Sequence, residues 1–187
     1  MGEKVSVKAE VEGEIDLKKE SIAANTAFEI DGGELLYDRF YLDMKNNAFF
    51  SSCEANYEIP KRSLQLSSLR LSLKDILALD THGTLLYKPG DQRINLSVGI
   101  PETALKPVFD HFILEPFQTE KPFLTTLNIG GTISGDMELE GIGTDWVVTG
   151  HFKWHDGTLS SGENDLTFQG IHLDLPVWYQ TQEGERD

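Results

Sequence analysis

The sequence is poor in cysteine, in positive charge and in long apolar runs, and each of these absences excludes or disfavours a class of protein. Its one cysteine, Cys53, excludes an internal disulfide framework, although 187 residues suffice to fold without one; we interpret Cys53 as a small core residue. Only 16 basic residues oppose 31 acidic ones, a net charge of −15. Because nucleic-acid binding needs a basic surface that displaces counterions, this charge excludes a nucleic-acid binder and disfavours direct adhesion to an anionic membrane. No stretch approaches the ~20 apolar residues of a membrane-spanning helix.

Apolar and charged side chains alternate from residue 5 to residue 17, with Gly13 as the one interruption. Successive side chains of a strand point to opposite faces, so this pattern predicts a long strand with one apolar and one charged face, and Gly13 predicts a bulge. Similar segments recur along the chain, separated by turn signals at the spacing typical of all-β proteins. Residues 31–33 are expected to join 28–30 to 35–37 in a hairpin, and 82–83, 130–131 and 155–157 are expected to be turns.

Two details of the pattern carry further predictions. The leucines between residues 64 and 73 alternate except at Leu69, which indicates a bulge or short turn at Ser67–Ser68. The segments GELLY at residues 33–37 and GTLLY at 83–87 echo each other, and this weak repeat is typical of stacked or meandering sheets.

One segment departs from strand. Residues 102–114 place their apolar side chains at helical spacing, and Pro107 predicts a helix that begins near Lys106 or two abutting short turns, ended by Pro116 and Pro122. We therefore predict an all-β, mainly antiparallel fold with long amphipathic strands, as a curved open sheet with a groove or as a sandwich, and one short helix near 102–114. Residues 1–180 are expected to form a single β-rich domain, a segment of a larger protein, and 181–187 a disordered polar tail.

The residues that carry chemistry form no recognisable constellation. His151 and His155 lie four residues apart, which on a strand is about 13 Å, too far to share one zinc ion. Cys53 has no base beside it, the glycines at 130–135 fit no phosphate loop, and no pair of carboxylates stands out. The tryptophans at 146, 154 and 178 favour core or sheet-edge packing over sugar stacking. We expect no catalytic residue, no metal site and no cofactor.

Residues 124–179 carry a family resemblance. The pattern is LNIGGTISGDMEL at 127–139, a strand from Trp146 to Trp154, DGTL at 156–159 and GIHLDLP at 170–176. It resembles the YdbH branch of the AsmA-like, TamB-related proteins. The resemblance implies a large, non-enzymatic bacterial envelope protein, anchored in the inner membrane and mostly periplasmic. Its sheet would curl into an apolar groove that bridges the two membranes and conducts phospholipid. The chain departs from the family in its short length and in having no membrane anchor.

For this groove hypothesis, the expected ligand is a phospholipid or another apolar molecule. The expected lining consists of Val5, Val7, Val11, Ile94, Leu96, Val98, Ile133, Met137 and Leu139. The alternative is a β-sandwich binding or adhesion module that recognises a glycan or a protein partner. Unpaired sheet edges would also allow dimerisation through edge strands. The alternation alone leaves open whether the apolar face is a closed core or an open groove.

Overall fold

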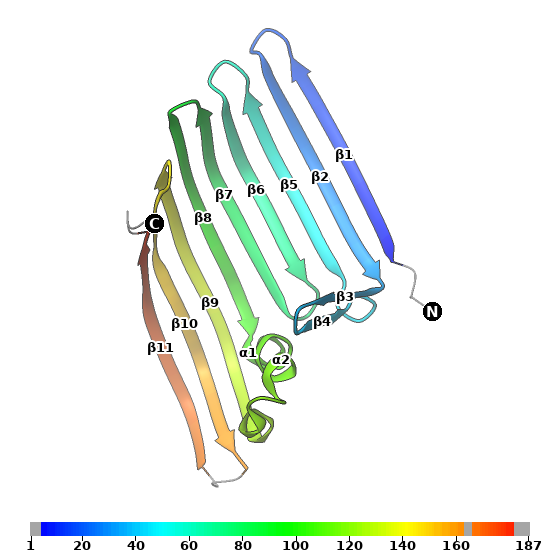
Figure 1. The fold of residues 1–187 in the computed structure, drawn as a ribbon, viewed down its shortest axis with the longest axis vertical. Coiled ribbons are helices and arrows are strands. Elements are labelled where there is room, and N and C mark those ends of the chain that lie inside the picture. Colours follow the sequence, from blue (N-terminus) through cyan, green and yellow to red (C-terminus); the bar gives the residue numbers. More distant parts are fainter. Residues whose placement is uncertain (1–4, 163–165, 182–187) are drawn as a thin grey trace, which may run out of the picture.

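The computed structural model, which describes residues 5–162 and 166–181, contains one antiparallel sheet of nine strands that does not close (Figure 1). The strands are β1 (Ser6–Asp16), β2 (Ser21–Gly32), β5 (Phe49–Glu58), β6 (Ser63–Leu73), β7 (Leu77–Lys88), β8 (Asp91–Ala104), β9 (Leu127–Ile142), β10 (Asp145–Ser161) and β11 (Leu166–Gln180). They lie in this order across the sheet, with β1 and β11 at its edges. The predicted all-β, antiparallel fold is confirmed, and of the two predicted forms it is the curved open sheet.

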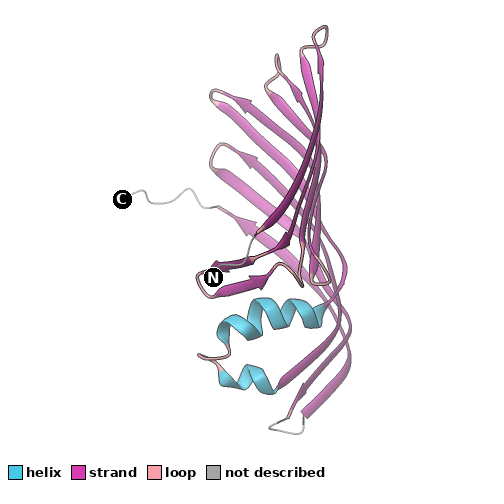
Figure 2. Cartoon of the chain, turned by 90° about the vertical axis from the view of Figure 1, so that its right-hand side faces the viewer, coloured by secondary structure: helices cyan, strands magenta, loops and turns pink. Residues whose placement is uncertain are grey.

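Two insertions interrupt the meander. Between β2 and β5 the chain forms a hairpin of β3 (Glu34–Tyr37) and β4 (Phe40–Asp43), and between β8 and β9 it forms α1 (Leu105–Phe109), η1 (Asp110–Leu114), α2 (Glu115–Phe117) and η2 (Pro122–Thr126). Figure 2 shows both insertions on one side of the sheet and at one end of its strands, where the sheet bends toward them. Residues 33–48 and 105–126 are together called the cap. The strand ends beside them are the capped end, and the opposite ends are the open end.

The predicted helix is present as one continuous helical segment from Leu105 to Phe117. Pro107 lies in its first turn, where a backbone N–H would have no acceptor within the helix. The middle turn is a π-helix in which Glu115 N–H donates to Asp110 O. Pro116 therefore does not end the helix at once, since the segment runs to Phe117, and Pro122 begins the short 3₁₀ helix η2.

Several predicted turns are kinks within long strands. Gly83 lies inside β7 with φ +148°, and Gly131 lies inside β9 with φ +97°. Residues 155–157 form a bulge inside β10, where the register shifts between His155 and Thr158. Glycine permits a sharp bend in a strand as readily as a turn, so the sequence signal is the same for both.

Other local predictions also change. Residues 35–37 pair with β4 and not with β2, whose partners are β1 and β5. Gly13 pairs in register with Ala24 and makes no bulge. The echoing segments 33–37 and 83–87 lie in unlike places, the small hairpin and the middle of β7, so the echo does not correspond to a structural repeat. Of the predicted tail, Thr181 is held by β10 through Trp146, and 182–187 lie outside the described residues.

Candidate functional site

The two faces of the sheet differ in chemistry along its whole width. Residues paired across neighbouring strands lie on the same face of the sheet. A chain of such pairs from β1 to β11 therefore gives one row of side chains on one face. One row is Val11, Thr26, Cys53, Leu69, Thr81, Val98, Met137, Gly150 and Val177, and the next is Gly13, Ala24, Ala55, Leu66, Gly83, Leu96, Leu139, Val148 and Tyr179. A row on the other side is Glu10, Ala27, Ser52, Arg70, Asp80, Gly99, Asp136, His151 and Pro176. These sides are called the apolar face and the polar face.

The bulge in β6 keeps its leucines on the apolar face. The register shifts between Leu66 and Leu69, so Ser67 and Ser68 take up the extra residue. As a result Leu64, Leu66, Leu69, Leu71 and Leu73 all have apolar-face partners on β5 and β7. The predicted bulge at Ser67–Ser68 is confirmed. We call this line of side chains the leucine ladder.

The apolar face is open to solvent over most of its area. In the described part of the chain the buried apolar side chains are Met44, Ala48, Leu66, Ile76, Phe109, Leu124 and Ile133, and all but Leu66 lie in or beside the cap or the β6–β7 turn at the capped end. Elsewhere the face is bare: Val11 is 74% exposed and Leu175 is 49% exposed. Exposed apolar surface of this extent is unusual in a monomer and marks binding sites.

Apart from Val5, which precedes β1, the predicted groove residues share this face but do not form one cluster. Leu96 pairs with Leu139 and Val98 with Met137, so the β8–β9 group is contiguous, whereas Val7 and Val11 lie five strands away on β1. Ile94 continues the β8 row toward the open end and pairs with Gly141. Val5 precedes β1 and is 60% exposed next to Gly33. Ile133 is 4% exposed on β9, the strand that α1 contacts, so it belongs to the small covered core.

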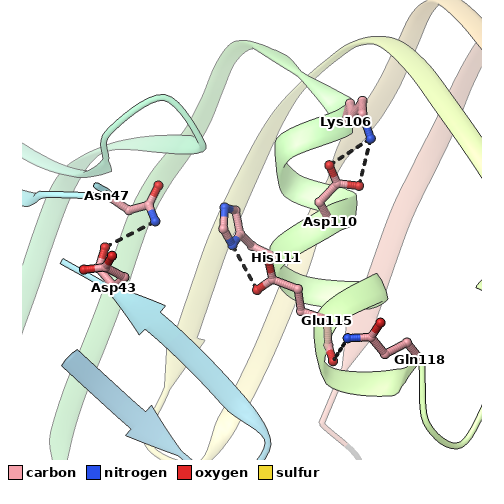
Figure 3. Close-up of polar contacts among 7 residues, drawn as sticks. All are labelled: Asp43, Asn47, Lys106, Asp110, His111, Glu115 and Gln118. Carbon is pink, nitrogen blue, oxygen red and sulfur yellow. Dashed lines mark hydrogen bonds and ion pairs between the residues drawn. The ribbon is translucent and has the colours of Figure 1, made fainter. Parts of the chain in front are cut away.

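The hairpin and the helix of the cap are joined to each other. Arg39, in the β3–β4 turn, donates from Nη1 to Glu120 Oε1 at 3.1 Å, and its guanidinium lies 4.9 Å from the centre of the Phe117 ring. Figure 3 shows the helix facing the loop after β4, with His111 on the side toward Asn47. The cap therefore bridges β2 and β5 to β8 and β9 above the middle strands.

This bridge predicts the effect of Arg39→Ala. Loss of an exposed ion pair and a cation–π contact should destabilise the closed cap by about 1 kcal/mol, which speeds amide hydrogen exchange in β3 and β4 about fivefold. Exchange in β6 should stay unchanged. The matched control is Arg70→Ala, which removes an exposed ion pair to Asp80 on the polar face and should leave β3 and β4 at the wild-type rate. Equal exchange in the two variants would show that Arg39 does not hold the cap.

Beneath the cap lies a cavity of about 400 Å³. The sheet contributes Ile30, Phe49, Leu71, Ser72, Leu73, Leu77 and Leu79, and the cap contributes Leu35, Leu42, Met44 and Phe112. None of these residues was among the predicted lining. The alternation could place the sheet residues on a face, but no pattern in the sequence indicates that two insertions separated by residues 49–104 fold over the same end.

The polar face carries ion pairs. His151 Nδ1 lies 2.7 Å from Asp174 Oδ1, and this hydrogen bond lowers the pKa of Asp174 below its ordinary value. His155 and His172 are edge to face, with ring centres 6.2 Å apart. Within residues 5–162 and 166–181, no three histidine, cysteine or acidic side chains gather as metal ligands. The polar face thus resembles a solvated sheet surface.

Cys53 is placed differently from the prediction, and the tryptophans lie on the last two strands, β10 and β11. Cys53 is half-buried on the open apolar face and not in a closed core. Trp154 is part-buried and donates its Nε1–H to Gly130 O, whereas Trp178 is 69% exposed on edge strand β11.

Among the described helices, none is long and apolar enough to cross a membrane.

These features define an open, single-layered amphipathic β-sheet with a capped apolar face. Comparison with models of protein families gives no match, and comparisons with curated proteins and with solved structures give no significant match either.

Proposed function

We propose that this chain is a non-enzymatic segment of a bacterial envelope protein of the AsmA-like, YdbH type, and that its apolar face holds or conducts phospholipid between the inner and outer membranes. The segment would lie in the periplasm and belong to a parent protein anchored in the inner membrane. The observation that carries this proposal is the continuous apolar face, which crosses all nine strands and is open to solvent outside the cap.

The chemistry of the two faces supports a lipid ligand. Acyl chains need apolar surface and offer no hydrogen bonds, and the apolar face supplies such surface at a gain of roughly 25 cal/mol for each Å² removed from water. The polar face, with residues such as Glu10, Asp80 and Asp136, keeps the sheet soluble while the other face is occupied. A sealed core would leave no such surface for a ligand.

Native mass spectrometry of the purified chain, followed by lipid extraction, tests the proposal. We expect bound phospholipid that is released on denaturation. A protein that carries no lipid, binds none from added vesicles and is retained on a glycan column would refute it and favour the adhesion module.

The thiol of Cys53 gives a second test, because it lies on the apolar face between Thr26 and Leu69. Bound lipid should slow its alkylation by N-ethylmaleimide, about a hundredfold at a free lipid concentration of about 100 times Kd. The control is a Ser52→Cys, Cys53→Ser double variant, which moves the thiol to the polar face of the same strand. Its alkylation should be insensitive to lipid, and equal protection of both thiols would argue against binding on the apolar face.

A further inference from the structure

The cavity beneath the cap is lined almost wholly by hydrocarbon. The exception is Ser72, whose register with Phe50 places its side chain on the polar face. A buried water needs two to four polar partners, and a peptide would bring backbone N–H and C=O groups that find no partner there. At about 400 Å³ the cavity falls in the size range of ligand pockets. The lining therefore favours a group without hydrogen-bonding atoms, such as a hydrocarbon chain.

The leucine ladder leads out of this cavity toward the open end of the sheet. Leu71 and Leu73 line the cavity, and Leu64 pairs with Leu85 near the other end of the strands. The ladder spans nine residue steps from 64 to 73, roughly 30 Å at ~3.3 Å per residue. A bilayer's hydrocarbon core is also about 30 Å thick and is shared by two opposed acyl chains. One acyl chain therefore fits on the ladder along its whole length.

From this geometry we infer that the cavity binds the methyl end of a single acyl chain, and that the chain lies along the leucine ladder, parallel to the strands. This inference rests on the proposed function, which it makes specific by naming the site and the orientation of the lipid. The polar group of the lipid lies toward the open end, because the cavity offers it no hydrogen-bond partner and burying it there would be costly.

Photo-crosslinking to the intact chain tests the orientation. Two analogues of palmitic acid serve as probes, one with a diazirine near its methyl end and one with a diazirine near its carboxylate. The methyl-end probe is expected to label peptides of the cap, around Leu42 and Phe112. The carboxylate-end probe should label the parts of β6 and β7 about 15 Å from the cavity, where Leu66 pairs with Gly83.

The outcomes separate this inference from the proposed function. If both probes label the same peptides, or if the methyl-end probe labels only residues outside the cap, the inference is wrong while lipid binding stands. If neither probe labels the chain and native mass spectrometry finds no bound phospholipid, both proposals fail.

A substitution that fills the cavity gives a quantitative check. Leu71→Trp should weaken palmitate binding about a hundredfold, because several methylenes lose their buried site, and it should abolish labelling of the cap. The matched control is Val147→Trp, at a half-buried apolar residue on the polar face, where it pairs with Glu140 and Gln180. Comparable weakening in both variants would overturn the assignment. Crosslinking of the wild-type chain decides the matter even if Leu71→Trp does not fold.

Discussion

The double variant Leu96→Asp, Val98→Asp is expected to fold and to carry no lipid. Both side chains are half-buried on the apolar face, where they pair with Leu139 and Met137. A carboxylate in contact with hydrocarbon costs roughly 3 kcal/mol, so two of them should lower occupancy below detection. Because the face is open, the same carboxylates stay hydrated in the lipid-free protein, and we expect a loss of only about 1–3 kcal/mol in the free energy of unfolding. Lipid extraction and urea unfolding measure the two effects.

The matched control places the same charges on the other face of the same strand. Asn95→Asp, Ser97→Asp adds two carboxylates on the polar face, opposite Glu140 and Glu138, and should keep wild-type lipid content. If the Leu96, Val98 variant retains lipid, the apolar face is not the binding surface. If it instead loses more than about 4 kcal/mol, the cost expected for an unpaired buried charge, the face is a sealed core in solution.

Gly83→Ala is expected to be strongly destabilising for so small a substitution. A Cβ at this position would lie 2.1 Å from Asn95 O and 2.8 Å from Leu96 Cα, at a φ of +148° that side chains rarely adopt. The backbone of β7 must shift away from β8 to relieve this overlap. We expect a loss of about 3 kcal/mol in the free energy of unfolding, measured by urea denaturation.

Gly99→Ala is the control for Gly83→Ala. Gly99 lies on the neighbouring strand β8, where an added Cβ would meet only Asp80 O at 3.7 Å. Its substitution should change stability by no more than about 0.5 kcal/mol. Gly150 in β10 repeats the situation of Gly83, with Asp136 O at 2.1 Å and φ +159°, so Gly150→Ala should behave like Gly83→Ala. If both Gly83→Ala and Gly150→Ala leave the free energy of unfolding unchanged, the backbone is not kinked at these positions.

The alternation of side chains predicted the amphipathic sheet because a strand's period of two is a local property. The same holds for the leucines of β6, where the change of parity at Leu69 predicted the bulge that the register shows. The helix was predicted from local spacing as well, within a few residues of Leu105–Phe117. These features need no knowledge of distant partners.

Features that depend on distant contacts escaped prediction. Besides β1, β2 pairs with β5, which follows the inserted hairpin in the chain. Residues 31–37 carry no signal that the chain leaves the sheet here and does not turn back to pair with β2. Whether the apolar face is sealed depends on whether a second layer covers it, and the cap covers only one end of the face. The cavity depends on Leu35, Leu42 and Phe112 meeting β6 and β7, which local patterns do not encode.

The nine strands alternate strictly in direction, and this constrains how further strands can be added to the sheet. In a sheet with an odd number of antiparallel strands the two edge strands run in the same direction, so β1 and β11 are parallel to each other. A second copy added head to tail with its apolar face on the same side would have to join by parallel pairing, which is slightly weaker than antiparallel pairing. Two copies that meet through like edges keep antiparallel pairing, and so does a further hairpin on either edge. Head-to-tail addition of copies is thus disfavoured relative to pairing through like edges or to extension within one chain.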